Sequence, residues 1–419
     1  MKKNILNTLI LSTISLITFS SCDTSSPIGP GGEAEHTILI YLCGADLESS
    51  NSYGTDNLNE MLSVNIPSNV NVVVQTGGAN KWFNSKLQSL LDNGNYVNRL
   101  EIRNKKINVK QSLGKVNMAA SATFQSFLEW GLKNYPAKRT GVILWDHGDS
   151  MNGVCLDENY STYSYDYLTN DEFMTAIENV YRKRNMTIGE DKFEWIGYDA
   201  CLMGVLDLMT TNSKYFNYQV SSEETEPGPG WSYSGFLSYL AQNVKGDTES
   251  FLANICDTYK SKCDQLYIDE GYSASDNEST LSVVDLSKID AVKDAFDLTF
   301  VNALKTKISS KSNFASFFKG VATKGKYGYD YDSRTYGDVF DIKHVTKKAN
   351  TSYSISKTEL DEAVEQAVIY KSNGTAHNDS CGIAITAPAY GWIMSSSYSL
   401  TSTELTNWRS WLTNMGTWY

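Results

Sequence analysis

Histidine, proline and an excess of basic residues are what this 419-residue sequence lacks, and each shortage argues against a class of protein. The 4 histidines, at positions 36, 147, 344 and 377, form no cluster with metal-ligand spacing, and no two cysteines form a CxxC pair. With 7 prolines and 29 glycines, the chain is neither collagen-like nor of low complexity. The formal net charge of −12 argues against a nucleic-acid binder, which needs clustered lysine and arginine to meet phosphates.

What is present is the profile of a globular protein, with 41% hydrophobic and 20% charged residues. At about 100–200 residues per domain, the length allows two or three domains. The 7 cysteines are scattered without the spacing of a disulfide-rich protein, which leaves disulfide bonds open: Cys22, Cys43, Cys155, Cys201, Cys256, Cys263 and Cys381. Cys256 and Cys263 share one face of a predicted helix, which we expect to be buried.

The first 22 residues have the pattern of an export signal. Lys2 and Lys3 precede the apolar stretch Ile5–Phe19, which is too short and too polar to predict a membrane span. The sequence FSSC then resembles a bacterial lipobox, in which Cys22 is lipidated; an ordinary secretory signal or a retained anchor are the alternatives. Residues 23–36, rich in Ser, Pro and Gly, suit a flexible tether. We therefore expect a cell-envelope protein, lipid-anchored to a bacterial membrane or surface-exposed, and otherwise a secreted one.

Apolar runs and helical periodicity alternate over residues 37–270. The runs predict strands at Thr37–Leu42, Asn71–Gln75, Gly141–Trp145, Phe193–Tyr198 and Tyr218–Ser222. Helices are predicted at Met118–Asn134, Leu168–Arg184 and Leu202–Met209. This alternation indicates an α/β domain with a mostly parallel sheet.

Residues 271–419 carry a weaker signal and predict a C-terminal α+β unit that completes the sheet or packs on it. The expected elements are strands at Leu281–Leu286 and Gly382–Ala387, helices at Ser287–Lys305 and Lys357–Tyr370, and a loop at Gly320–Ser333.

Two predicted strands end abruptly at reactive side chains. One continues into Asp146-His147-Gly148 and the other into Asp199-Ala200-Cys201. Carboxyl ends of parallel strands face the ligand crevice, so His147 and Cys201 are expected to share a cleft. Cys201 also opens a predicted helix, whose N-terminus would favour a thiolate and hence a cysteine nucleophile with a histidine partner. The plain alternatives are a small buried cysteine and a hydrogen-bonded surface histidine.

The two motifs resemble those of caspase-like cysteine peptidases, which carry His-Gly after one strand and Ala-Cys after the next. Within that clan, the segments HTILIYLCGADLES, GVILWDHGDS, YDACLMGVLDL and SSEETEPGPGWSY, in this order, are similar to clostripain-like (C11) peptidases. The resemblance is good over residues 36–240 and looser beyond. It implies a caspase-like sandwich, with helices flanking a mostly parallel central sheet and a C-terminal α+β extension.

The resemblance also implies roles for residues. Cys201 matches the nucleophile and His147 the general base and acid, while the N–H groups of Gly148 and Cys201 would form the oxyanion hole. Asp199 matches the acid of a pocket that binds Arg or Lys before the cut; its alternative role is a structural hydrogen-bonder. Asp146 is not expected to orient His147, because neighbouring strand residues point to opposite faces.

The implied function is a cell-envelope cysteine endopeptidase that cleaves protein or peptide substrates after Arg or Lys. The alternatives are a non-catalytic surface lipoprotein that binds proteins or glycans, and another acyl-transfer enzyme such as an amidase. No Lys or Arg occurs from Gly148 to Tyr181, so the autocleavage site expected just after the histidine is missing.

Several acids and one aromatic residue near these motifs have more than one candidate role. No cofactor is expected, although some family members need calcium, for which Asp157, Glu158 and Asp166 are candidates without EF-hand spacing. The acids Glu223, Glu224 and Glu226 could add negative potential to the cleft and Trp231 an apolar floor; a solvated turn is the alternative.

Overall fold

The computed structural model describes residues 34–160, 166–330, 335–387 and 404–415. Cys22, the export signal and most of the tether lie outside the described residues. No helix in the described ranges is long and apolar enough to cross a membrane.

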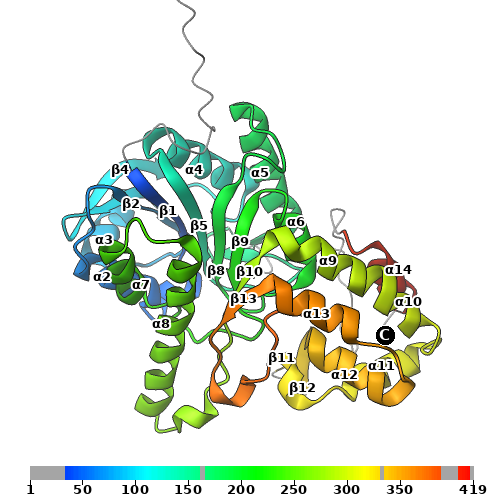
Figure 1. Cartoon of the computed structure of the whole chain (residues 1–419). Coiled ribbons are helices and arrows are strands. Elements are labelled where there is room, and N and C mark those ends of the chain that lie inside the picture. Colours follow the sequence, from blue (N-terminus) through cyan, green and yellow to red (C-terminus); the bar gives the residue numbers. More distant parts are fainter. Residues whose placement is uncertain (1–33, 161–165, 331–334, 388–403, 416–419) are drawn as a thin grey trace, which may run out of the picture.

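A nine-stranded sheet forms the centre of the described part of the chain (Figure 1). Its order is β13-β10-β9-β8-β5-β1-β2-β3-β4, and the five strands from β9 to β2 are parallel, with an antiparallel pair at each edge. The strands are β1 (Ala34–Cys43), β2 (Val70–Gly77), β3 (Val97–Arg103), β4 (Lys106–Gly114), β5 (Ala137–Trp145), β8 (Phe193–Asp199), β9 (Phe216–Ser221), β10 (Ser282–Asp285) and β13 (Val368–Lys371).

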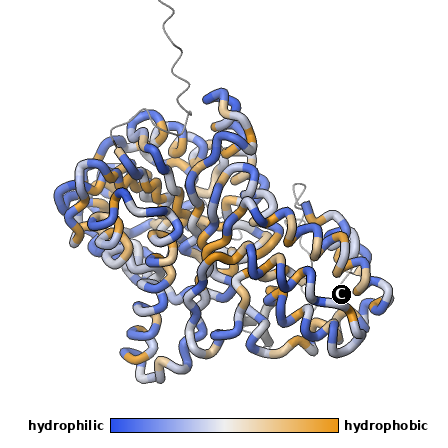
Figure 2. Tube along the Cα trace, viewed as in Figure 1, coloured by the Kyte–Doolittle hydropathy of each residue, from blue (hydrophilic) through white to orange (hydrophobic). Residues whose placement is uncertain are grey.

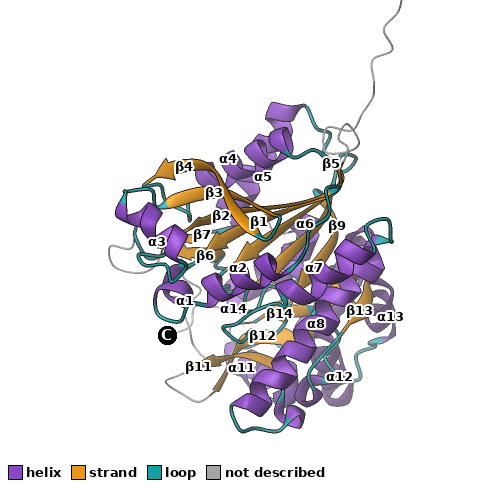
Figure 3. Cartoon of the chain, turned by 90° about the vertical axis from the view of Figure 1, so that its left-hand side faces the viewer, coloured by secondary structure: helices purple, strands orange, loops and turns teal. Residues whose placement is uncertain are grey.

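Helices cover both faces of this sheet, because its central strands are apolar on both sides. In β1, Leu39 and Tyr41 face one apolar cluster, whereas Ile38 and Ile40 face the other. The first cluster includes α4 (Ser121–Asn134), α5 (Asn170–Arg184) and α6 (Leu206–Asn212); the second includes α2 (Tyr53–Ser63), α3 (Ser85–Asp92), α7 (Tyr233–Gln242) and α8 (Thr248–Asp269). Figure 2 shows the apolar strands at the centre, and Figure 3 shows the layers from the side.

The chain after residue 270 supplies β10 and β13 to one edge of the sheet. The rest of it packs beside that edge, as α9 (Ile289–Lys293), α10 (Val301–Lys305), α11 (Lys311–Lys319), α12 (Ile342–Tyr353), α13 (Thr358–Ala367), α14 (Thr406–Met415) and a small sheet of β11 (Lys326–Asp330), β12 (Thr335–Asp341) and β14 (Ala384–Thr386). One continuous apolar cluster joins α4 and α5 to Phe318 and Trp408 of this region. A hairpin, β6 (Val154–Asp157) and β7 (Asp166–Leu168), follows β5.

The predicted mixed α/β fold, with a mostly parallel central sheet flanked by helices, is confirmed. Three local predictions are wrong. The helix predicted from residue 202 begins at Leu206, the stretch Val368–Lys371 is a strand rather than the end of a helix, and Lys326–Asp330 is a strand rather than a loop. Long-range pairing decides the last two, since β13 pairs with β10 and β11 pairs with β12.

Candidate active site

Strand register brings the two predicted catalytic residues together at the carboxyl ends of the parallel strands. Trp145 at the end of β5 pairs with Asp199 at the end of β8, and His147 and Cys201 each follow two residues later. Both side chains line a pocket of about 320 Å³ together with Asp199, Glu226 and Leu47 of α1 (Ala45–Ser49). The prediction that parallel strand ends gather these residues therefore agrees with the geometry.

Cys201 lies in a turn and not at the start of a helix, so the helix-terminus argument for a thiolate is wrong. The helix α6 begins five residues later, and Leu202 has a left-handed φ of 63°. The backbone N–H of Glu226 donates to the Cys201 sulfur at 3.2 Å. Burial, followed by the nearby carboxyl groups of Glu226 and Glu224, raises the pKa of the Cys201 thiol to about 12. The thiol is thus protonated at rest, and a base must remove its proton.

His147 is half exposed and contacts an acid that sequence reasoning missed. Its Nε2 lies 2.9 Å from Oδ1 of Asp46, in the short helix α1 directly after β1. The signal was present, because Asp46 follows the apolar run of β1 as His147 follows that of β5. This contact takes up Nε2, so Nδ1 is the ring nitrogen left to meet other groups. Asp146, in contrast, is buried and accepts the backbone N–H of Leu156 in β6.

Gly148 lies against the backbone of the nucleophile. A Cβ at this position would lie 2.5 Å from the carbonyl oxygen of Cys201, so the turn itself, and not only an approaching substrate, requires glycine here. Gly148 also forms a bridge with Val154, whose hydrogen bonds run from Asp149 N to Gly153 O at 3.0 Å and from Cys155 N to His147 O at 3.2 Å. Neither bond uses the Gly148 N–H, as an oxyanion-hole role would need.

Asp199 and Glu226 form a buried acid pair at the pocket. Asp199 accepts hydrogen bonds from Trp231 N and Tyr233 Oη, each at 3.0 Å, and its carboxyl group shares another with that of Glu226. Burial raises the pKa of Asp199 to about 7, and burial followed by the Asp199 charge raises that of Glu226 well above its usual value. Two carboxyl groups hydrogen-bond only when one carries a proton, so the free pocket holds a proton.

Glu223, Glu224 and Trp231 do not line the pocket. Trp231 is completely buried beside Gly197, where a Cβ would meet its ring. Glu223 and Glu224 are buried as well and face the chain after residue 270. They are therefore neither solvated turn residues nor part of the pocket wall.

The acids considered for calcium already have partners of their own. Asp157 accepts the N–H of Met118 at 2.8 Å, Glu158 that of Asn80 at 2.6 Å, and Asp166 the amide of Asn117 at 2.5 Å. They form no group that fits a metal ion; among the described residues, the group with suitable spacing is Glu223, Asp341 and Cys381. The six described cysteines are free thiols, with Cys256 and Cys263 buried on α8 as predicted.

Comparisons with known proteins agree with this architecture. The model of the clostripain family matches residues 40–414. A secreted C11 cysteine protease from Bacteroides thetaiotaomicron, solved with an irreversible peptide inhibitor, is 16% identical over 90% of this chain and 99% of that one, with a TM-score of 0.63. An inactive zymogen C11 protease from Parabacteroides distasonis is 17% identical over 92% and 99%, with a TM-score of 0.60. No curated protein matches the chain.

Proposed function

Because the chain belongs to the clostripain family and is a cysteine peptidase, we propose that Cys201 and His147 form its catalytic pair and that it cleaves polypeptides after Arg or Lys. The observation that carries the proposal is the pairing of Trp145 with Asp199, which delivers thiol, imidazole and acid pair to one pocket. A surface protein that only binds other molecules has no need of that combination.

The proposed reaction uses these groups in the following order. His147 takes the thiol proton, and the Cys201 sulfur bonds to the carbonyl carbon while the N–H groups of Gly148 and Cys201 stabilise the oxyanion. The C–N bond then breaks, and His147 returns the proton to the leaving amine. Water attacks the thioester, His147 accepts its proton, and the acid product leaves as the thiol is re-protonated. Asp46, 2.9 Å from the imidazole, stabilises the charged ring in both steps.

The acid pair supplies the preference for a basic residue before the cut. An arginine or lysine side chain that enters the pocket meets Asp199 and Glu226, both buried, where charge-assisted hydrogen bonds are strong. We further propose that the enzyme acts outside the cytoplasm, lipid-anchored through Cys22 or released. The sequence pattern of residues 1–22 supports this, and so does the description of the Bacteroides relative as secreted.

The test is cleavage of matched fluorogenic peptides that end in Arg, Lys, Asp or Ala. The protein without residues 1–22 and its Cys201→Ala variant are compared, with and without calcium. Turnover of the Arg and Lys peptides that disappears in the variant is the expected result. Turnover of Asp or Ala peptides instead would overturn the pocket assignment. If the folded protein cleaves none of the peptides, it is treated mildly with trypsin and assayed again. A lack of turnover after that treatment would overturn the proposed catalytic pair.

A further inference from the structure

The loop after β9, Ser222–Glu226, connects the catalytic turn with the chain beyond residue 270. On one side, Leu202 N donates to Glu224 O at 3.1 Å and Gly204 N to Ser222 O at 2.7 Å, so the loop holds the turn of Cys201. On the other side, the N–H groups of Glu223 and Glu224 donate to the hydroxyl of Thr280, just before β10, at 3.1 and 3.0 Å.

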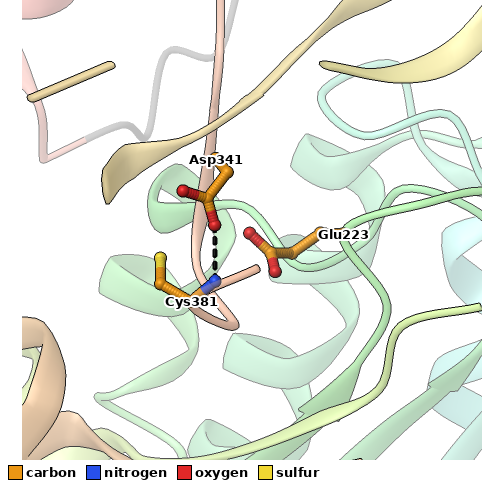
Figure 4. A group of neighbouring side chains, drawn as sticks. All are labelled: Glu223, Asp341 and Cys381. Carbon is orange, nitrogen blue, oxygen red and sulfur yellow. Dashed lines mark hydrogen bonds between the residues drawn. The ribbon is translucent and has the colours of Figure 1, made fainter. Parts of the chain in front are cut away.

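The Glu223 side chain leaves the loop toward the C-terminal region. It is only 1% exposed, and its Oε2 accepts the N–H of Gly382 at 2.8 Å. Figure 4 shows its carboxyl group facing that of Asp341, whose second oxygen accepts the N–H of Cys381 at 2.5 Å. Asp341 in turn contacts Nδ1 of His344 at 2.9 Å. Burial, followed by the Asp341 charge, raises the pKa of Glu223 well above its usual value, so Glu223 is the protonated partner.

The Glu224 side chain makes a second, separate connection. Its Oε1 accepts the N–H of Gly328 in β11 at 3.0 Å and that of Thr225 at 2.7 Å. Its Oε2 lies 3.5 Å from Nε2 of His377. A third connection is made by backbone alone, because Ala384 N of β14 donates to Gly204 O at 2.8 Å.

We propose that Glu223 and Glu224 are positioning residues, through which the region from β11 to β14 holds Cys201 in place for catalysis. The proposal rests on the role of Cys201 proposed above. Hydrogen bonds connect the C-terminal region to the two buried carboxyl groups of the loop. Further hydrogen bonds connect the backbone of the loop to the turn of Cys201. The N–H of Glu226, at the end of the same loop, donates to the Cys201 sulfur. A shift of the loop therefore moves the nucleophile together with this hydrogen-bond donor.

A metal ion at Glu223, Asp341 and Cys381 explains these contacts less well. Both oxygens of Asp341 already accept hydrogen bonds, and the Cys381 thiol donates to Ile383 O at 3.2 Å. The one oxygen without a donor, Oε1 of Glu223, is accounted for if it carries the proton shared with Asp341. Lys371 and His344 already offset the negative charge of the two carboxyl groups, which leaves less of that charge to attract a cation.

The experiment compares Glu223→Ala, Glu223→Gln and Glu224→Ala in the full chain. Glutamine copies a protonated glutamate, because its oxygen accepts from Gly382 and its amide donates to Asp341. The matched control is Asp297→Asn. Asp297 is a buried acid of the chain after residue 270, and it accepts the N–H of Trp408, which is not part of the Ser222–Glu226 loop. Two readouts are taken: peptide turnover, and the rate at which iodoacetamide alkylates Cys201, followed by mass spectrometry.

The alanine variants are expected to lower kcat about ten- to hundredfold with little change in KM, since a misplaced nucleophile reacts slowly. They are also expected to raise alkylation of Cys201, because a less buried thiol ionises more readily. Buried Cys43 stays unlabelled, which shows that the fold persists. Glu223→Gln and Asp297→Asn should remain near wild type in both readouts.

Two results would overturn the proposal: alanine variants that behave like Asp297→Asn, or a Glu223→Gln variant as impaired as Glu223→Ala. Alkylation needs no particular peptide, so it still decides if the proposed Arg/Lys preference fails. If the alanine variants unfold and label Cys43, Glu223→Asp and Glu224→Asp replace them. Each keeps the acid but draws its carboxyl group back by one methylene from Gly382 or Gly328, which weakens the hydrogen bond to the C-terminal region. An unchanged kcat and alkylation rate in those variants would also count against the proposal.

Discussion

The two strand ends that meet at the pocket are built in opposite ways. At the end of β8, Cys201 lies in a turn held by the backbone of a buried loop, which is itself held by Glu223 and Glu224. At the end of β5, the His147 side chain is 36% exposed and forms an ion pair with Asp46, whose side chain is 47% exposed. Buried hydrogen bonds fix a position much more strongly than an exposed ion pair does. The sulfur is therefore held in place, while the imidazole is freer to move, as the proposed transfer of a proton between the sulfur and the leaving amine requires.

The two ends also differ in how they hold protons. Burial raises the pKa of Cys201 to about 12 and that of Asp199 to about 7, so both groups at the β8 end keep their protons to a higher pH than they do in water. The β5 end instead offers a partly exposed imidazole ring 2.9 Å from the carboxyl group of Asp46. In the proposed mechanism the β8 end holds the proton at rest and the β5 end transfers it, and each of the following predictions tests one side of that division.

Removing the imidazole should have the largest effect. In His147→Ala, kcat/KM for an Arg peptide is expected to fall by about 10³-fold or more, because a thiol with so high a pKa has almost no thiolate at neutral pH. The measurement is steady-state turnover beside Cys201→Ala as the zero reference. A His147→Ala variant that retains more than about a tenth of the activity would show that the thiol loses its proton to another base, and the division of roles would fail.

Removing the charge of the pocket should have the next largest effect. Asp199→Asn is expected to lower kcat/KM about 100-fold for Arg peptides and to leave Ala peptides nearly unchanged, because only a cationic side chain needs the carboxylate. The exposed acid Asp56 provides the control variant, Asp56→Asn, which should change neither. An equal loss for both peptides would mean that Asp199 supports the turn of Cys201 and does not select the substrate.

The same acid predicts a pH dependence that is specific to basic substrates. The pKa of Asp199 is raised to about 7, so this carboxyl group gains a proton as the pH falls through that value and the pocket loses negative charge. KM for an Arg peptide is therefore expected to rise about tenfold from pH 8 to pH 6, while KM for an Ala peptide stays nearly constant. Asp199→Asn should abolish the difference, and a parallel change in both peptides would contradict the assignment.

The sequence predicted the strand ends but not how each end is held. The apolar runs before His147 and Cys201 predict that both residues follow the carboxyl ends of strands, because parallel strands end on the same side of a sheet. The turn at Cys201 was mistaken for a helix, because LMGVLDLM has helical spacing while Gly204 is fixed by pairing with β14. For Glu223 and Glu224 the sequence offers a cleft wall or a solvated turn, and both are wrong, because their C-terminal partners Gly328 and Gly382 lie more than 100 residues away in the sequence. Contacts of that range leave no local pattern.

Asp46 should give the smallest effect. Because its ion pair with His147 is exposed, it is worth at most about 1 kcal/mol, so Asp46→Asn is expected to lower kcat no more than about fivefold and to leave KM unchanged. Salt screens exposed charges, and the difference from wild type should therefore shrink at about 0.5 M salt. The measurement is kcat at low and high salt, with Asp56→Asn as the control. A loss of about 100-fold that persists at high salt would mean that the histidine end depends on Asp46 as strongly as the cysteine end depends on its buried loop, and the contrast between the two strand ends would no longer hold.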